Sequence, residues 1–477
     1  MPPNHRPAFH FLPEHYWMND PNGLIEWQGQ THLFYQYIPN AAFRDKLHWG
    51  HAVSADRVHW QHLPVALAPT PGGPDAGGCW TGSAVDNDGV PTLIYTGIDP
   101  QVVCLATSAA GASADGLLTW TKHQANPVIS GPPAELATAA QGQFRDPFVW
   151  REAGAWHMVI GCKDKDHGGL VLRYRSADLV HWDYRGVLLA GDMNQGEPFR
   201  TGTVWECPNY FELDGQRVLI FSPGDEIRHT QYSVVYAASR QDEPFTPTAQ
   251  GLVVYGPSFY APQSLRLGDG RRMMWGWLKE TRSRETQLAE GWSGAMSLPM
   301  ALSWRPGAPG ELGIAPAEEL KDLRREHWHF ENLDVAQTDA GLLSAINGDC
   351  LEMEAVCQLD PGAELGLRLR AAPDGQEQTR VRYQAAQQQL AVDTRASSLS
   401  AEVAGGLTTA PLGLAPGEPL RLHIFLDRSV LEVFANGRRC LAVRLYPTRD
   451  DSLGLGLVSQ GSARLAALDI WKMGTIW

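Results

Sequence analysis

Positively charged residues are scarce in this sequence and never form a run. Lysine and arginine together number 39, against 53 aspartate and glutamate residues, and the formal net charge is −14. A chain without a basic stripe is not expected to bind nucleic acid or an anionic membrane surface. No segment approaches the roughly 18–20 apolar residues of a membrane-spanning helix. These absences predict a protein whose partners are neither nucleic acids nor membranes.

Cysteine is also infrequent. The seven cysteines are scattered and odd in number, which favours reduced thiols over a disulfide framework. The opening residues, MPPNHRPAFHFLPEHY, lack the charged head and apolar stretch of a secretory signal. A motif that looks catalytic begins already at Trp17, which leaves no room for a removable leader. We therefore expect a cytoplasmic protein.

Glycine and proline, by contrast, are abundant. The 477 residues include 48 glycines and 33 prolines, which is typical of many short strands joined by tight turns. Hydrophobic residues make up 43% of the chain, enough for a substantial core. The 17 tryptophans suit core packing and also stacking on sugar rings.

A repeat of roughly sixty residues organises the first two thirds of the chain. In each unit a strand opens with polar residues, and the unit is marked in turn by Asp20, Ser83, Asp146, Glu206 and Gln263. A second register follows about forty residues later in each unit. It reads SADRVHW at 54–60, LTW at 118–120 and SADLVHW at 176–182, with weaker echoes at Phe245 and Trp304.

Short alternating or apolar runs lie between these markers, such as THLFYQYI at 31–38 and RVLIFSPG at 217–224. About four such strands per unit, repeated five times, predict a five-bladed β-propeller. The first strand of each blade then lines a central channel. This arrangement would bring Asp20, Asp146 and Glu206 together. The alternative is an ordinary β-sandwich in which these residues occupy separate surface turns.

The pattern of hydrophobic and polar residues changes in the last third of the sequence. The propeller is expected to occupy residues 1–312, and the charged segment 313–329 is expected to form a helical linker. Residues 330–477 contain longer alternating strands and a tight hairpin turn at Asn436-Gly437. The fold class predicted is therefore all-β, with a five-bladed propeller followed by a β-sandwich.

Three acids at blade starts suit the cleavage of a sugar acetal, which needs a proton donor and a second carboxylate. The Asn19 side chain and the Pro-Asn-Gly turn can hydrogen-bond Asp20, so we expect a low pKa and an ionised nucleophile. Glu206 lies between Trp205 and Cys207-Pro208, an apolar collar that suits a general acid. Arg145 should keep Asp146 ionised, which suits substrate binding and charge stabilisation.

Several motifs together resemble glycoside hydrolase family 32, the invertase, inulinase and levanase family. They run in family order along nearly the whole chain: WMNDPNG (17–23), FYQY (34–37), WGHAVSADRVHW (49–60), WTGSA (80–84), FRDP (144–147), ECP (206–208), YAPQS (260–264), GWSGAMSLP (291–299) and FLDRSVLEVFANG (425–437). The resemblance implies a propeller plus sandwich, retention of anomeric configuration, and no metal or organic cofactor.

The resemblance also assigns roles. The nucleophile falls on Asp20, the transition-state stabiliser on Asp146 and the acid/base on Glu206. The positions implied to bind sugar are Asn19, Gln36, Trp49, Trp80, Thr81, Ser83, Arg145, Tyr260 and Trp277. The implied enzyme is a β-fructofuranosidase that releases terminal β-D-fructofuranosyl units from sucrose and short fructo-oligosaccharides by double displacement. Exo-acting inulinase or levanase activity and fructosyl transfer use the same site and stay open.

Three positions depart from the family pattern: Arg44, where an aromatic residue is usual, Ile38 and Met300. Either Phe43 supplies the missing ring or the pocket rim is more polar. These departures concern the leaving-group side and leave the preferred fructoside undecided.

Two alternative functions stay open. A propeller glycosidase acting on arabinose- or xylose-containing polymers, or a non-catalytic sugar-binding protein, would share the scaffold. His48, His51 and His59 are expected to be hydrogen-bonded within a blade and not to bind a metal. Cys207 is expected to pack beside Glu206 and not to act as a redox switch. The sequence leaves a homodimer through the sandwich open.

Overall fold

The computed structural model describes residues 4–43, 45–109, 117–136, 140, 142–196, 201–225, 230–231, 234–240, 244–305, 308, 310–335 and 342–477. Almost all regular structure in these residues is β-strand. The helical segments α2 (Arg284–Glu290) and η1, a 3-10 helix (Glu318–Leu323), are short. None of the described helices has the length and apolar character needed to cross a bilayer.

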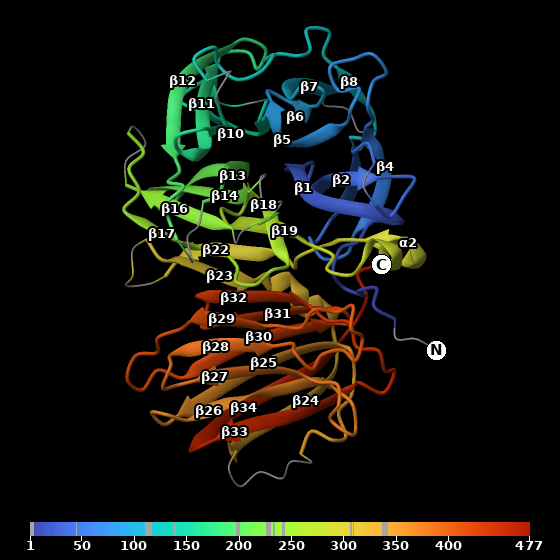
Figure 1. Ribbon diagram of the computed structural model, residues 1–477, viewed down its shortest axis with the longest axis vertical. Helices are drawn as coiled ribbons and strands as arrows, with labels where there is room; N and C mark the ends of the chain where they lie inside the picture. The colour runs from blue at the N-terminus through green and yellow to red at the C-terminus, as the bar shows by residue number, and fades with distance from the viewer. Residues whose placement is uncertain are drawn as a thin grey trace.

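Five sheets surround one axis in the upper part of the molecule (Figure 1), and each contributes one strand to the centre. Each central strand contacts the central strand of the next sheet, and the last contacts the first. These central strands are β1 (Tyr16–Trp27), β5 (Cys79–Asn87), β9 (Phe144–Glu152), β13 (Val204–Leu213) and β18 (Phe259–Arg266). The five-bladed β-propeller predicted from the repeat is confirmed.

The outer strands of each blade follow in chain order, so each blade is a meander of antiparallel strands. In the first three blades they are β2 (Gln30–Ile38), β3 (His48–Ser54), β4 (Gln61–Leu67), β6 (Val90–Gly97), β7 (Val102–Ser108), β8 (Trp120–Lys122), β10 (Ala155–Asp164), β11 (Gly168–Ser176) and β12 (Trp182–Ala190). In the last two they are β14 (Gln216–Asp225), β15 (Thr230–Gln231), β16 (Val235–Ser239), β17 (Ala249–Leu252), β19 (Arg272–Leu278), β21 (Ala295–Met296), β22 (Met300–Trp304) and β23 (Leu312–Pro316).

A short parallel pairing closes the ring. Strand β20 (Trp292–Ser293) pairs with the start of β1, so that Trp292 lies opposite Tyr16 and Ser293 opposite Trp17. Strand β21, two residues further on, pairs with β19 of the fifth blade. The same few residues therefore join the last blade to the first.

The second repeated motif forms the turn between the third and fourth strands of a blade. In 54–60, Asp56 Oδ1 accepts the backbone N–H groups two and three residues later at 2.9 and 2.8 Å. In 176–182, Asp178 makes the same two bonds at 2.9 and 2.8 Å. In each turn the following histidine approaches the other carboxylate oxygen at 2.8 Å. The shared sequence thus specifies a shared aspartate-centred turn.

Two sheets pack face to face below the propeller (Figure 1) and form the predicted β-sandwich. The first sheet, in spatial order, contains β24 (Arg324–Asp334), β34 (Ala463–Met473), β25 (Cys350–Leu359), β30 (Leu420–Asp427), β31 (Val430–Ala435) and β32 (Arg439–Arg444). The second contains β29 (Leu407–Pro411), β28 (Gln389–Asp393), β27 (Thr379–Gln384), β26 (Glu364–Ala371) and β33 (Gly454–Gln460).

The segment predicted as a helical linker, 313–329, contains more than a helix. Strand β23 of the fifth blade runs to Pro316, and sandwich strand β24 begins at Arg324. The 3-10 helix lies between them and buries Leu320 and Leu323. The chain therefore passes from propeller to sandwich over a short segment that is itself packed.

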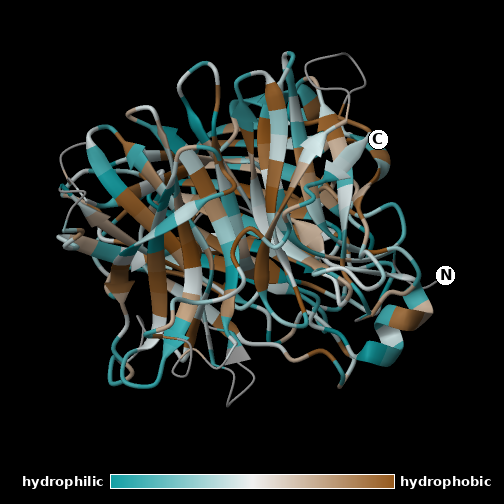
Figure 2. Ribbon diagram, turned by 90° about the horizontal axis from the view of Figure 1, so that it is seen from above, coloured by the Kyte–Doolittle hydropathy of each residue, from teal (hydrophilic) through white to brown (hydrophobic). Residues whose placement is uncertain are grey.

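Hydrophobic segments lie along the strands, and hydrophilic ones gather in the connecting loops (Figure 2). One buried cluster crosses the boundary between the two domains. It unites Phe9 and Phe11 of the N-terminal segment with residues of the propeller and with Phe425 and Phe434 of the sandwich. The two domains thus share part of their core, and the N-terminal segment lies within it.

A buried ionic cluster lies at this boundary. His10 contacts Asp427 Oδ2 through Nδ1 at 2.8 Å and Glu432 Oε2 through Nε2 at 3.1 Å, and all three side chains are fully buried. Burial alone would lower the pKa of His10. The hydrogen bonds and charges of the two carboxylates outweigh it and raise this pKa to about 9. His10 is therefore an imidazolium shared by two sandwich carboxylates.

Replacing His10 by glutamine should destabilise the protein by about 3 kcal/mol at pH 6, because two buried carboxylates lose their cation. The raised pKa makes this contribution fully present below the ordinary value of 6.5 and lost as the pH rises through about 9. Urea-unfolding midpoints measured across this range should fall for the wild type and change less for the variant. His15→Gln, at a mostly exposed histidine, is the matched control. Equal pH dependence in wild type and His10→Gln would contradict the assignment.

Candidate active site

A single cavity of about 750 Å³ opens at one end of the central channel. Asp20, Asp146 and Glu206 all line it, although they come from the first, third and fourth blades. The three acids that the repeat singled out are therefore neighbours around one space, and not side chains of separate surface turns.

Every central strand carries a β-bulge where it reaches this cavity. The residues of the central strands that lie in these register shifts are Asn19-Asp20, Thr81, Asp146-Pro147, Cys207-Pro208 and Ala261-Pro262. In the third, fourth and fifth blades the first bulged residue has a positive φ, of 67°, 48° and 46°. A bulge bends the strand and changes the direction of its side chains. In these three blades the second bulged residue is a proline, which has no N–H that could be left unpaired.

The bulges also correct the equivalences assumed between blades. Asp20 and Asp146 lie within bulges, Glu206 lies just before one, and Ser83 and Gln263 lie after. The residues that correspond to Glu206, each paired immediately before its bulge, are Met18, Trp80, Arg145 and Tyr260. The repeat located the right part of each strand, but the single-residue alignment was wrong.

Three donors surround the carboxylate of Asp20. Thr81 Oγ1 donates to Oδ2 at 2.7 Å, Asn19 Nδ2 donates to Oδ1 at 3.0 Å, and the Cys207 thiol lies 3.6 Å from Oδ2. Trp17 Nε1 in turn donates to Asn19 Oδ1 at 2.7 Å, which orients that amide. The position of Asp20 is therefore fixed by neighbours from three blades.

Asp146 is held by the backbone of the neighbouring blade. Its Oδ2 accepts the Cys207 N–H at 2.9 Å, and the Cys207 thiol lies 3.5 Å from the same oxygen. The Asp146 N–H donates to Thr96 Oγ1 at 2.8 Å. One thiol thus lies between the carboxylates of Asp20 and Asp146, so Cys207 packs against both acids, and burial raises its pKa well above the ordinary value.

Glu206 accepts a hydrogen bond on each oxygen. Arg145 Nη2 donates to Oε1 at 3.0 Å, and the Tyr260 hydroxyl donates to Oε2 at 2.5 Å. These two donors occupy the positions that correspond to Glu206 in the blades on either side. They fix the direction of the carboxylate within the cavity.

The pKa of Asp20 differs from the low value expected. Burial raises it to about 6, and the hydrogen bonds from Thr81 and Asn19 only partly oppose this. Burial likewise raises the pKa of Asp146 to about 7, against the lowering effect of the Arg145 guanidinium. The residues next to the two acids in the sequence correctly indicated a hydrogen bond from Asn19 to Asp20 and the effect of the Arg145 charge on Asp146. They could not indicate how completely both carboxyls are removed from water.

Most of the other predicted sugar-binding residues line the cavity. These are Asn19, Gln36, Trp80, Thr81, Arg145, Tyr260 and Trp277. Trp49 and Ser83 do not. Trp49 is fully buried and donates from Nε1 to the Trp80 carbonyl at 3.0 Å, so its role as a stacking wall is wrong. Ser83 is also buried and accepts the Val149 N–H at 3.0 Å.

Several cavity residues were not predicted. Trp17 lines the wall and packs on Trp277 with ring centroids 6.2 Å apart, and it opens the WMNDPNG motif that could have drawn attention to it. Lys279 lies behind the wall, with Nζ 4.9 Å from the Tyr260 ring centroid, and burial lowers its pKa to about 8. No motif marks Lys279. The remaining unpredicted lining residues are Asp45, Lys46, Leu47, Ala76, Gly77, Ile98, Asp99, Cys207 and Gln231.

The three departures from the family pattern lie in different places. Ile38 lines the cavity, whereas Met300 is buried in the core of the fifth blade. Arg44 lies outside the described residues. Phe43 packs edge-on against Trp17, with ring centroids 5.7 Å apart, so its ring supports the cavity wall from behind.

The three histidines close in sequence do not converge. His51 is buried, approaches His32 at 2.9 Å and stacks on Phe34. His48 approaches the Lys46 carbonyl at 3.0 Å. His59 belongs to the aspartate-centred turn of 54–60. Each has a partner of its own within the first blade.

Comparison with known proteins identifies relatives along the whole chain. The model of the glycosyl hydrolases family 32 N-terminal domain matches residues 10–316, and that of the family 32 C-terminal domain matches residues 319–472. Sucrose-6-phosphate hydrolase of Zymomonas mobilis is 34% identical over 98% of this chain and 92% of its own length. Raffinose invertase of Escherichia coli is 34% identical over 98% of this chain and 95% of its own.

Solved structures agree with these matches. Fructan 1-exohydrolase IIa from Cichorium intybus, in complex with 1-kestose, superposes with a TM-score of 0.85 at 26% identity. The alignment covers 99% of this chain and 98% of the other. The similarity therefore includes the propeller, the sandwich and their mutual arrangement.

Proposed function

Because the chain belongs to glycosyl hydrolase family 32, we propose that Asp20, Asp146 and Glu206 release terminal fructosyl units from sucrose and short fructo-oligosaccharides. Family membership and the named relatives show a glycosidase that acts on fructosides, with small carbohydrates as substrates. The residue roles, the stereochemistry and the choice among fructosides are our proposal. The observation that carries it is the convergence of three acids from three blades on one cavity.

In the first step, Asp20 attacks the anomeric carbon of the fructosyl unit. Its Oδ1 and Oδ2 are anchored by Asn19 and Thr81, so the carboxylate does not need to be reoriented before it reacts. Glu206 protonates the glycosidic oxygen as the bond to the leaving sugar breaks. The products of this step are a fructosyl ester on Asp20, a free alcohol and an ionised Glu206.

In the second step, Glu206 removes a proton from a water molecule, and the resulting hydroxide attacks the same anomeric carbon. The ester bond to Asp20 breaks, fructose leaves, and both carboxyl groups return to their initial states. Two inversions at one carbon give net retention. One residue acts as acid and then as base, which requires a fixed carboxylate, and the donors Arg145 and Tyr260 supply that fixation.

Asp146 suits sugar binding and charge stabilisation. Its Oδ2 is occupied by the Cys207 N–H, whereas Oδ1 makes no hydrogen bond with any residue in the described part of the chain. Oδ1 is therefore available to accept a hydroxyl of the fructosyl unit. When ionised, Asp146 also stabilises the positive charge that develops at the anomeric centre.

The proposed substrates are neutral short fructosides. The named relatives include enzymes for sucrose 6-phosphate, raffinose and fructans, so the family alone does not choose among them. The cytoplasmic location expected from the sequence favours imported sucrose and short oligomers over polymers. The seven unpaired cysteines, six of them buried, support a reducing compartment. A homodimer through the sandwich stays a prediction.

Substitution of the acids tests the assignment. Asp20→Asn should abolish hydrolysis of sucrose, and Glu206→Gln should lower kcat by about 10²–10⁴-fold. For p-nitrophenyl β-D-fructofuranoside, whose leaving group departs without protonation, Glu206→Gln should lose much less kcat/KM, which reports the first step. Its kcat should stay low, because the second step still needs Glu206 as base. Asp45→Asn, at an exposed acid of the same cavity, is the control and should keep kcat within about tenfold. Near-normal turnover by Asp20→Asn would refute the mechanism.

The pH profile tests the state of the nucleophile. Asp20 must be ionised to attack, and its pKa is raised to about 6, so kcat/KM should fall as the pH drops through about 6. Thr81→Val removes a hydrogen bond that lowers this pKa, so it should move the acidic limb upward by about one unit. Thr81→Ser keeps the hydroxyl and should leave the limb in place. An acidic limb that is identical in all three proteins would rule out this coupling.

A substrate panel tests the choice of fructoside. We expect kcat/KM to be highest for sucrose or 1-kestose and lower for inulin, levan and sucrose 6-phosphate. Product analysis at high sucrose concentration should show free fructose as the main product. Preference for a polymer or for the phosphorylated sugar would overturn the proposed substrate class, and a build-up of longer oligomers would indicate fructosyl transfer. Neither result would change the roles of the three acids.

A further inference from the structure

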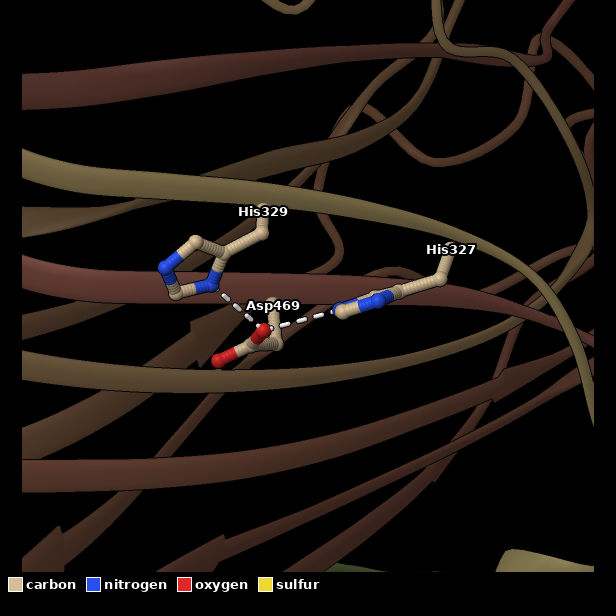
Figure 3. Close-up of side chains that lie close together, drawn as sticks. All are labelled: His327, His329 and Asp469. Carbon is tan, nitrogen blue, oxygen red and sulfur yellow. Dashed lines mark hydrogen bonds and ion pairs between the residues drawn. The ribbon is translucent and has the colours of Figure 1, made fainter.

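The outer face of the six-stranded sandwich sheet carries two histidines and an aspartate that converge. His327 and His329 project from the same side of β24, and Asp469 meets them from β34 (Figure 3). His327 Nε2 lies 2.8 Å and His329 Nδ1 lies 2.7 Å from the same atom, Asp469 Oδ1. The strands are paired antiparallel, with His329 directly opposite Asp469, so the backbone fixes this arrangement.

Each histidine has a second contact that orients its ring. The other nitrogen of His329, Nε2, lies 2.9 Å from Glu331 Oε1, two residues along the same strand. The contact with Glu331 keeps a proton on Nε2, and a metal ion bound at Nδ1 replaces the proton that Nδ1 shares with Asp469. The His327 ring stacks on Trp471, with centroids 4.7 Å apart and planes 5° apart. Histidines that bind metals commonly donate their other ring N–H to a carboxylate, as His329 does to Glu331.

We propose that His327 Nε2, His329 Nδ1 and Asp469 bind a divalent transition-metal ion of the zinc class at this surface. Two imidazoles and one carboxylate form a typical ligand set for such ions. Their candidate ligand atoms all lie within 4.8 Å of one another. Neighbouring ligands around tetrahedral zinc are about 3.3 Å apart, given bonds of about 2.0–2.1 Å. Small side-chain rotations suffice to admit the ion, and water completes its coordination.

A second cluster of acidic and histidine side chains on the same sheet is held together by an arginine. Glu352, Glu354 and His423 also lie close together, but Arg324 already neutralises them, since its guanidinium bonds both carboxylates. Arg324 therefore takes the place that a metal ion would need. At Asp469, no lysine or arginine in the described part of the chain forms an ion pair. The carboxylate is shared by two imidazoles alone.

Titration with zinc chloride tests the proposal, with the full-length protein freed of any affinity tag. Isothermal calorimetry of the wild type should show about one zinc ion bound per chain. His327→Gln, His329→Gln and Asp469→Asn should each weaken binding by at least about tenfold. Glu331→Gln, which removes only the outer carboxylate, should weaken it less. Hydrolysis of sucrose by all four variants should match the wild type, because these residues lie on the sandwich.

His181→Gln is the matched control, since His181 has an aspartate partner at 2.8 Å in an exposed turn but belongs to no three-residue cluster. It should bind zinc as the wild type does. Cobalt(II) provides a second readout: visible absorption of a tetrahedral cobalt site should appear in the wild type and disappear in Asp469→Asn. Absence of zinc binding by the wild type would overturn the proposal. Binding unchanged in all three ligand variants would do so too, because the ion would then lie elsewhere.

Discussion

The closure of the propeller ring is the constraint on which the site depends. Asp20 belongs to the first blade, whereas Asp146 and Glu206 belong to the third and fourth, so the acids meet only if the ring is complete. The parallel pairing of β20 with β1 joins the last blade to the first immediately before Asp20. At Gly294, a Cβ atom would lie 2.1 Å from the Met18 carbonyl oxygen, and φ is 81°. Glycine is therefore required where the closing segment crosses β1.

The bulges at the inner ends of the central strands are the second requirement. Positive φ values at Asp146, Cys207 and Ala261 each cost on the order of 1–3 kcal/mol, and they are retained because the surrounding sheet determines the backbone. In return, the Cys207 N–H turns toward Asp146 and its thiol lies between two carboxylates. In a regular strand the N–H of a residue lies in the plane of the sheet and pairs with the neighbouring strand, whereas its side chain leaves the sheet on one face. The strained backbone thus places the N–H and the thiol of Cys207 against the two carboxylates.

The sequence predicted the fold through periodicity and the acids through their recurrence. Polar residues every sixty positions located the inner end of each blade, and the SADxVHW repeat marked identical turns. The predictions that were wrong concern the burial of individual side chains and the exact equivalence of residues between blades. Trp49 looked like a wall residue because it is a tryptophan beside a motif, but its ring is sealed in the core. The pKa of Asp20 was misjudged because neighbours in sequence reveal donors but not the exclusion of water. Lys279 carries no local signal in the sequence, since its place near the site is visible only from its packing against Tyr260.

The sandwich takes part in holding the ring together. Asp427 accepts the backbone N–H groups of residues 8, 9 and 10, which lead into β1. Glu432, five residues along the same hairpin, accepts the N–H of Leu298 just after the closing segment. His10 contacts both carboxylates. One buried imidazolium therefore links the segment that precedes β1 to the segment that follows β21. A shift of the sandwich would move both sides of the closure together. The C-terminal domain carries none of the three acids, but two of its carboxylates anchor both chain segments that meet where the ring closes.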